Sequence, residues 1–140
     1  MVQDFVKPPP RQKEHKVNFY RLCLDCDNGK KDVLSSRELC GQFMDVLVKV
    51  LEVKEIGRVV CEVGGPSWNG LPPGISIASL YVESGSQLHT WPENGRFYLD
   101  ITSCKHFFSS PVISLIKDWF GANVKVKYAS REVLENGEIK

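Results

Sequence analysis

The sequence has no marked excess of charge of either sign. Its 18 lysine and arginine residues nearly balance its 17 aspartate and glutamate residues, and the formal net charge is +1. The basic residues are scattered along the chain and do not form a band. We therefore expect neither nucleic acid nor an anionic membrane surface as a partner.

Long hydrophobic runs are missing as well. No apolar run approaches the ~20 residues that a helix needs to cross a bilayer. The start of the chain has no hydrophobic region of the kind found in signal peptides. We therefore expect a cytoplasmic protein with no membrane partner.

Cysteine is present, but not in the pattern of a secreted disulfide framework. The chain has five cysteines, an odd number. Cys23 and Cys26 form a C-x-x-C pair, but no second pair and no suitably spaced histidine completes a zinc site. We interpret these two residues as ordinary cysteines at the end of a strand, and we expect no metal site.

The length of the chain suits a single domain. A chain of 140 residues with average apolar content can build one proper core, whereas two domains would be cramped. We expect this domain over residues 17–130. Residues 1–16 contain Pro8-Pro9-Pro10, which favours an extended, flexible leader; a ligand for a proline-recognition domain is the alternative. Residues 131–140 are expected to form a charged tail.

Two amphipathic helices are expected. Ser35 and Glu38 form a capping-box pattern that predicts the start of the first helix, and Gly57 marks its end. The apolar residues of this segment recur at helical spacing, which indicates a face packed on the core. That face consists of Leu39, Phe43, Val46, Leu47, Val50 and Leu51.

The second helix is expected near the end of the chain. Pro111 suits its first position behind a cap at Ser109 or Ser110, and Gly121 suits its end. Its apolar face also recurs at helical spacing. That face consists of Val112, Leu115, Ile116, Trp119 and Phe120.

The order of elements predicts the fold class. Alternation of apolar and polar residues predicts strands over 17–24, 58–63, 75–83 and 124–128, in addition to the hairpin described next. Strands, helix, strands, helix and strand in this order are typical of an α/β (α+β) fold. We expect a two-layer α-β sandwich, with a largely antiparallel sheet and helices on one face. The other face of such a sheet needs a cover.

The stretch 83–104 is the most informative part of the sequence. Asn94-Gly95 favours the two-residue type I′ turn of a β-hairpin, and apolar residues alternate with polar ones on the strand that follows. This stretch carries a hydroxyl, an imidazole and a thiol within one short hairpin.

The turn also predicts which residues face each other. A turn centred on Asn94-Gly95 places His89 opposite Asp100 and Cys104 opposite Gly85, and opposed residues share a face. A bulge at Pro92 is the alternative, and it would shift this register by one residue.

The distance between Ser84 and His89 sets a further condition. Along a straight strand these two residues are roughly 16 Å apart, which is too far for direct proton transfer. For His89 to act on Ser84, the strand must bend near its start. Gly85 has no Cβ and tolerates such a bend.

Several spaced residues form one recognisable pattern. Glu83-Ser84 is followed five residues later by His89, within His-Thr-Trp-Pro-Glu, and fifteen residues after that by Cys104. Upstream, residues 72–76 read Pro-Pro-Gly-Ile-Ser and match Pro-x-Gly-x-Ser. Each piece alone is weak, whereas the combination is specific. The pattern resembles that of the prokaryotic S-adenosylmethionine decarboxylase family.

The resemblance implies a self-processing enzyme. The chain would cut itself between Glu83 and Ser84, and Ser84 would become a pyruvoyl group. The resemblance also implies His89 as the acid and base of this processing, and Cys104 as the proton donor in decarboxylation. A pyruvoyl group forms a Schiff base with the substrate amine and accepts the electron pair released with carbon dioxide.

The resemblance also implies a substrate and a partner. The substrate would be S-adenosylmethionine, and its decarboxylated product donates aminopropyl groups in spermidine and polyamine synthesis. The active unit would be a homodimer with its active sites near the subunit interface. Ser76 is expected to assist cleavage and, with Glu93 and Trp68, to line the substrate site. For Trp68, which lies in the Gly- and Pro-rich loop 64–74, a loop anchor packed on the core is the alternative.

Two departures from the family pattern keep other functions open. Gly85 stands where the family has histidine, and Gly70 stands where it commonly has an aromatic residue that stacks on adenine. A basic amino acid (arginine, ornithine or lysine) is therefore an alternative substrate. Another alternative is an uncleaved, inactive homologue that binds a ligand or regulates a partner. Singly, Ser84, His89 and Cys104 also fit structural roles: a strand-end hydroxyl, a sheet histidine and a buried thiol.

Overall fold

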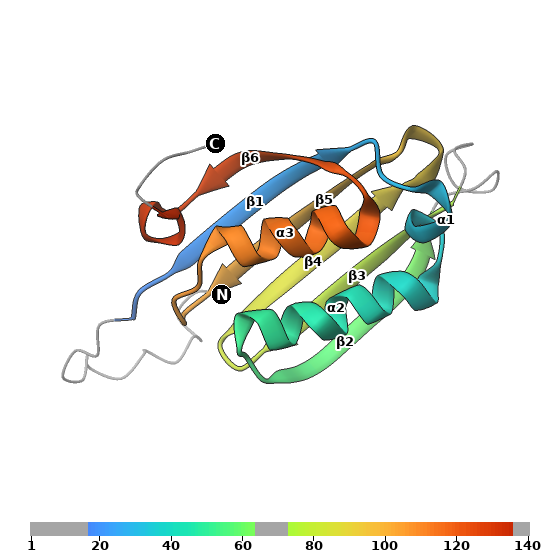
Figure 1. Cartoon of the computed structure of the whole chain (residues 1–140). Coiled ribbons are helices and arrows are strands. Elements are labelled where there is room, and N and C mark those ends of the chain that lie inside the picture. The colour runs from blue at the N-terminus through green and yellow to red at the C-terminus, as the bar shows by residue number, and fades with distance from the viewer. Residues whose placement is uncertain (1–16, 64–72, 136–140) are drawn as a thin grey trace, which may run out of the picture.

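The structure, a computed structural model, describes residues 17–63 and 73–135 as one antiparallel sheet with helices on one face. The six strands lie in the order β2-β3-β4-β5-β1-β6, and every neighbouring pair is antiparallel. Helices α2 and α3 lie side by side across the same face (Figure 1). The expected two-layer α-β sandwich is confirmed. The elements in chain order are β1 (Tyr20–Asp27), α1 (Lys31–Leu34), α2 (Arg37–Leu51), β2 (Glu55–Val63), β3 (Gly74–Tyr81), β4 (Ser84–Trp91), the 3₁₀ helix η2 (Pro92–Asn94), β5 (Arg96–Ser103), α3 (Ser109–Phe120), β6 (Asn123–Ala129) and the 3₁₀ helix η3 (Arg131–Val133).

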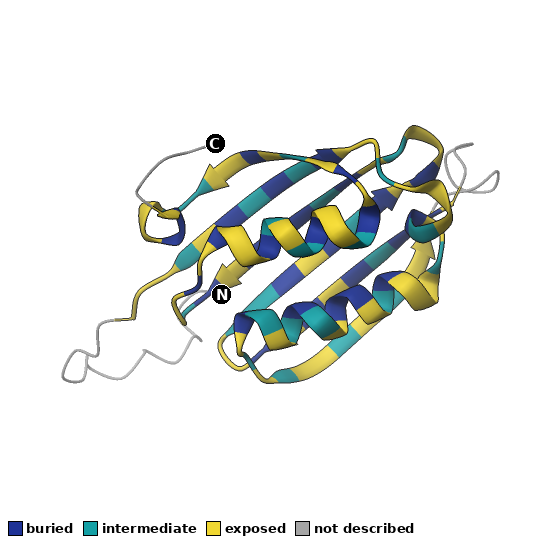
Figure 2. Cartoon of the chain, in the orientation of Figure 1, coloured by how far each residue is buried: buried dark blue, intermediate teal, exposed yellow. Residues whose placement is uncertain are grey.

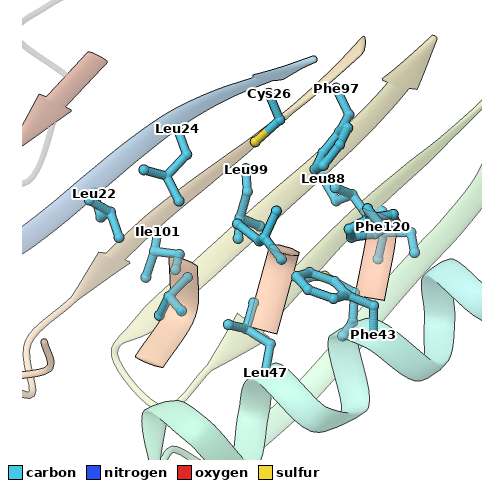
Figure 3. Packing of buried hydrophobic residues seen from close by; sticks show 14 of the residues in the cluster. Leu22, Leu24, Cys26, Phe43, Leu47, Leu88, Phe97, Leu99, Ile101 and Phe120 are labelled. Carbon is cyan, nitrogen blue, oxygen red and sulfur yellow. The ribbon is translucent and has the colours of Figure 1, made fainter. Parts of the chain in front are cut away.

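The core lies between the sheet and these two helices. Alternate residues of the central strands are buried, as in β5, where Phe97, Leu99 and Ile101 are at most 2% exposed. The helices contribute matching apolar faces, and the rings of Phe43 and Phe120 pack with their centroids 4.8 Å apart. Figure 2 shows the buried positions as bands along the strands, and Figure 3 shows how the side chains interlock. The apolar residues that recur at strand spacing and those that recur at helix spacing therefore pack into one core.

Helix α2 begins and ends at residues other than those expected. Ser36 caps it, because its side chain accepts a hydrogen bond from the backbone N–H of Leu39. Ser35 instead closes the short helix α1, which the sequence did not predict. At the other end the chain leaves the helix at Glu52, which has a φ of 55°, and Gly57 lies inside β2. Ser35 and Ser36 were both possible caps, and Ser36 takes this role because Ser35 ends α1.

Helix α3 ends as expected but begins earlier. Its first residue is Ser109 and not Pro111, and Phe108 takes the extended conformation of a cap residue without a capping side chain. Gly121 ends the helix with a φ of 64°, a conformation that glycine adopts without strain. Val133, in η3, is fully buried, so packing on the core continues past residue 130. Within the described residues, no helix is long and apolar enough to cross a membrane.

The face of the sheet turned away from α2 and α3 carries no helix among the described residues (Figure 1). We call it the open face. Several large apolar side chains lie on it, including Val59 at 65% exposed, Leu80 at 62% and Trp91 at 40%. By strand alternation and register the open face includes Arg21, Cys23, Asp25, Val59, Cys61, Val63, Ser76, Ala78, Leu80, Gly85, Gln87, His89, Trp91, Arg96, Tyr98, Asp100, Thr102, Lys125 and Tyr128.

Candidate active site

A tight turn between β3 and β4 presents Ser84 at one end of the sheet. Tyr81 pairs with Ser84, and only Val82 and Glu83 connect the two strands. Val82 is anchored by its backbone N–H, which donates to the carbonyl of Lys54 at 2.9 Å. Glu83 has a φ of 59°, in the left-handed region that side chains other than glycine and asparagine rarely adopt. The peptide bond before Ser84 therefore lies next to a strained residue.

Ser84 and Cys104 form one hydrogen-bonded group. The backbone N–H of Cys104 donates to Ser84 Oγ at 3.0 Å. The Ser84 hydroxyl in turn donates to Cys104 Sγ at 3.6 Å, and the thiol faces Glu83 Oε2 at 3.7 Å. Both residues are half-buried. The Ser84 hydroxyl, the Cys104 thiol and the Glu83 carboxylate thus form one continuous hydrogen-bonded group.

The pairing of β4 with β5 differs from the expected register. Gly85 lies opposite Thr102, and His89 lies opposite Tyr98, so neither the pairing with Asp100 nor the pairing with Cys104 occurs. The cause is the loop, because Pro92–Asn94 form a 3₁₀ turn that Gly95 closes with a φ of 65°. The strands separate at the pair Trp91 and Arg96, not at a two-residue type I′ turn.

The displacement is two residues along the partner strand, since His89 was expected opposite residue 100 and lies opposite residue 98. A displacement of two preserves the face of every side chain, because strand side chains alternate with a period of two. His89 and Asp100 therefore share the open face, as expected. Cys104 still reaches Ser84, because it lies just beyond the end of β5.

His89 belongs to a second group of polar residues. Its Nδ1 lies 2.8 Å from Ser76 Oγ, and its Nε2 lies 3.4 Å from Gln87 Oε1. Because an amide oxygen only accepts, Nε2 carries the proton and the Ser76 hydroxyl donates to Nδ1. The imidazole also packs on the ring of Tyr98, with the centroids 4.9 Å apart.

The surroundings of His89 favour its neutral form. Burial lowers the pKa of His89 below its ordinary value of 6.5, and the negative charge of Asp100 opposes part of this shift. A neutral imidazole can accept a proton at neutral pH, and here the proton reaches Nδ1 in place of the hydrogen bond that the Ser76 hydroxyl donates to it. The group is therefore suited to general base chemistry.

The two groups do not meet within one chain. The pairing of β3 with β4 runs without interruption from Ser76 opposite His89 to Tyr81 opposite Ser84, so the expected bend near Gly85 is absent. Ser84 and His89 remain roughly 16 Å apart along a regular strand. Gly85 serves another purpose, because a Cβ there would lie 2.9 Å from the carbonyl oxygen of Ser79.

The other expected site residues lie elsewhere. Glu93 lies in η2, at the end of β4 opposite to Ser84, and forms an ion pair with Lys31 at 2.6 Å. Trp68 and Gly70 fall outside the described residues. Gln87 was missed, although its position two residues before His89 places it on the same face.

The cysteines outside the Ser84 group form no disulfide bonds. Cys26 is buried in the core, whereas Cys23 lies on the open face, and all five cysteines are free thiols. Within residues 17–63 and 73–135, no three His, Cys, Asp or Glu side chains gather as a metal-binding group.

Comparison with known proteins connects this geometry to one family. Residues 20–132 match the family model described as S-adenosylmethionine decarboxylase. A Clostridium botulinum protein named S-adenosylmethionine decarboxylase proenzyme is 26% identical over 125 residues, which cover 89% of this chain and 98% of that protein. A protein of the same name from Archaeoglobus fulgidus is 28% identical over 75 residues, which cover 54% of this chain and 61% of that one.

A solved structure agrees with the fold. The adenosylmethionine decarboxylase of Aquifex aeolicus superposes with a TM-score of 0.61 at 18% sequence identity. The superposition covers 80% of this chain and 90% of that chain. At this identity the likeness supports the architecture, and the sequence matches carry the family assignment.

Proposed function

The chain belongs to the S-adenosylmethionine decarboxylase family, and we propose that it cleaves itself before Ser84 and then decarboxylates S-adenosylmethionine through a pyruvoyl group. The product would be the aminopropyl donor of polyamine synthesis. One observation carries the proposal more than any other: Ser84 Oγ is held against Cys104 directly after the strained residue Glu83.

The first step of cleavage is an attack by Ser84 Oγ on the carbonyl carbon of Glu83. The hydroxyl proton ends on the departing amide nitrogen, and the Cys104 N–H, which donates to Ser84 Oγ at 3.0 Å, holds that oxygen in place during the attack. The C–N bond breaks as the C–O bond forms, and the former amide nitrogen takes up a proton. The result is an ester between the Glu83 carboxyl group and the Ser84 side chain, with a free amine on residue 84.

The second step removes the proton from the α-carbon of residue 84. The electron pair of that C–H bond forms a carbon–carbon double bond, and the Glu83 carboxylate leaves from the β-carbon. The dehydroalanine that remains tautomerises to an imine, and one water molecule hydrolyses this to a ketone and releases ammonia. A base is needed at the α-carbon, and the neutral imidazole of His89 is suited to the task.

Backbone strain supports the choice of this bond. A residue other than glycine in the left-handed region costs about 1 kcal/mol. Glu83 bears this cost in the uncleaved chain, where a two-residue turn fixes its φ at 59°. Cleavage releases Glu83 from the turn and removes the cost. The intact precursor is therefore raised in energy relative to its products.

The residues around position 84 fit a pyruvoyl group formed there. Such a group acts as an electron sink for the bond that breaks when carbon dioxide leaves. Cys104 Sγ, close to the side chain of residue 84 in the precursor, can deliver a proton to the substrate α-carbon. The Cys104 N–H, which donates to Ser84 Oγ at 3.0 Å, can remain a donor to oxygen at that position.

His89 requires a second copy of the chain to reach Ser84. The two residues lie in separate groups on one unbent strand, so one protomer cannot bring them together. The open face carries exposed apolar side chains and can pack against the same face of another protomer. We propose a homodimer in which His89 and Ser76 of one protomer act on Ser84 of its partner.

Two measurements test the function. Intact mass spectrometry of the purified chain should reveal two fragments, one ending at Glu83 and one beginning at residue 84. Carbon dioxide release should be observed with S-adenosylmethionine and should be far slower with arginine, ornithine or lysine. Turnover of a basic amino acid without turnover of S-adenosylmethionine would reject the substrate, and an unbroken chain after ageing at neutral pH would indicate an inactive homologue.

A further inference from the structure

A shallow pocket of about 330 Å³ opens on the open face beside Ser84. It crosses three strands, so one wall comes from β3, the floor from β4 and the other wall from β5. Its β3 wall includes the apolar side chains of Ala78 and Leu80, of which Leu80 is exposed, whereas Gln87, Asp100 and Thr102 make its far end polar. The lining residues are Ala78, Ser79, Leu80, Ser84, Gly85, Ser86, Gln87, Asp100 and Thr102.

Gly85 is the residue that leaves this space open. It pairs with Leu80 on one side and with Thr102 on the other, so it lies at the centre of the floor. A Cβ at this position would lie 2.9 Å from the backbone oxygen of Ser79, which cannot move without displacing β3. A side chain at position 85 would therefore require β3 to shift in this chain, and glycine leaves the floor of the pocket free of side-chain atoms.

Among the described residues, Asp100 is the only charged one that lines the pocket. It lies opposite Gln87 on β4, one strand repeat of about 7 Å beyond the pair of Gly85 and Thr102. In the same part of the chain, no basic side chain lies within ion-pair distance of its carboxylate; Arg21, opposite Thr102 on β1, is the closest basic residue by register. Among the residues that the structure describes, the Asp100 carboxylate thus forms no ion pair and is the negative charge that the pocket lining offers to a ligand.

The residues around Asp100 respond to this charge. Burial raises the pKa of the Cys23 thiol, and the charge of Asp100 and its hydrogen bond to the thiol raise it further. The same charge adds to the effect of burial in raising the pKa of Tyr98. Both neighbours are therefore neutral at pH 7 and add no negative charge of their own beside the carboxylate. The positive charge of Arg21 acts on the pKa of Cys23 in the opposite direction.

We propose that this pocket binds the positively charged arm of the substrate, with Asp100 as the counter-charge. The methylene groups of the arm lie along Ala78 and Leu80, and the cation faces the carboxylate. Two kinds of substrate carry such a cation on an aliphatic arm: a sulfonium compound, and an amino acid that ends in an ammonium or guanidinium group. The inference rests on the proposed function, because it assumes that the substrate amine is held at residue 84.

Binding to the uncleaved chain tests the pocket without requiring decarboxylation. The Ser84→Ala chain and its Asp100→Asn derivative are titrated calorimetrically with S-adenosylmethionine, with its neutral thioether analogue S-adenosylhomocysteine, and with arginine. We expect Asp100→Asn to weaken binding of the cationic ligand roughly tenfold and to leave the neutral analogue unchanged. The cation that loses affinity identifies which substrate class the pocket takes.

Two control variants accompany this comparison. Asp25→Asn removes the same charge from the open face outside the pocket, where Asp25 lies 4.0 Å from Lys127, and should change no affinity. Asp100→Glu keeps the charge and should retain most of the cation affinity. Equal cation affinities with and without the Asp100→Asn change, or no binding of any cation to the Ser84→Ala chain, would overturn the inference.

The cleaved enzyme separates this inference from the proposed function. At pH 8, where His89 is neutral, the chain with Asp100→Asn should form its two fragments as the unmodified chain does, but with a roughly tenfold higher KM for its cationic substrate. Normal fragments with an unchanged KM would overturn the role of Asp100 and leave the proposed function intact. Absence of fragments from the unmodified chain would instead reject the proposed function.

Discussion

At the residue scale, Ser84 has a hydroxyl that is hydrogen-bonded to the Cys104 thiol, and the residue directly before it is strained. Replacing Ser84 by alanine removes the proposed nucleophile and keeps the turn. We expect the Ser84→Ala chain to remain whole and to release no carbon dioxide from S-adenosylmethionine, as measured by intact mass and a decarboxylation assay. Ser110→Ala, which removes an exposed hydroxyl on α3 bonded to Glu135, should cleave normally. Normal fragments from Ser84→Ala would place the cut elsewhere.

His89 predicts how cleavage depends on pH. Its pKa is lowered by burial below 6.5, so the imidazole stays neutral to a lower pH than in an exposed histidine. The rate of fragment formation should therefore be constant near neutral pH and fall only as the pH drops below 6.5. Because Asp100 opposes the shift, Asp100→Asn should move this acid limb to a still lower pH. A limb centred at or above pH 6.5 would contradict the role of His89.

At the scale of elements, the start of α2 offers a test of local stability. The Ser36 side chain accepts the Leu39 N–H at 3.0 Å and caps the helix. Ser36→Ala should lower the free energy of unfolding by about 1 kcal/mol, or the Tm by roughly 4 °C. Ser35→Ala removes only the bonds that this hydroxyl donates to the carbonyls of Lys31 and Asp32 in the short helix α1, and should have a smaller effect. A larger loss for Ser35→Ala in thermal unfolding would contradict this assignment of the cap.

The same elements explain how far the sequence predicts this fold. The apolar residues of α2, α3 and the strands recur at helix or strand spacing because all of them face one core. This spacing can be recognised in the sequence, and it predicts the sandwich correctly. The register of the β4–β5 hairpin was not predicted correctly. Asn94-Gly95 indicated a two-residue turn, whereas Pro92–Asn94 form a 3₁₀ turn. The end of α2 was missed for a related reason, since Glu52 adopts a left-handed conformation that its own propensity does not favour.

The candidate site was predictable only in part. The spacing of Ser84, His89 and Cys104 was readable in the sequence, and the contact between Ser84 and Cys104 is present. His89 and Ser84 are far apart because β4 is a regular, unbent strand. The sequence could not predict this, because glycine at position 85 is compatible both with a bend and with a close contact between strands. Asp100 was expected opposite His89, but no sequence signal indicated its place in the pocket.

At the scale of the whole molecule, the proposed homodimer predicts that cleavage passes between protomers. The His89→Ala chain and the Ser84→Ala chain should each remain uncut alone. When the two are produced together, mixed dimers combine an intact Ser84 with an intact His89, and the His89→Ala chain should be cut. Mass spectrometry identifies that chain by its substitution.

The matched control replaces the Ser84→Ala chain, which supplies the intact His89 in the mixture. Production of His89→Ala together with a chain that carries both Ser84→Ala and His89→Ala should give no fragments, because no imidazole is then available. Fragments in this control, or none in the mixture of the two single variants, would show that cleavage does not pass between protomers.

The central claim is that the chain cuts itself before residue 84 and leaves a ketone at the new end. The most direct test is the mass of the fragment that begins at residue 84 in the unmodified, purified protein. The account predicts a fragment lighter than a serine-terminated one by the mass of ammonia, and resistant to stepwise amino-terminal degradation. A free serine amine at that end, or a chain that stays whole, would contradict it.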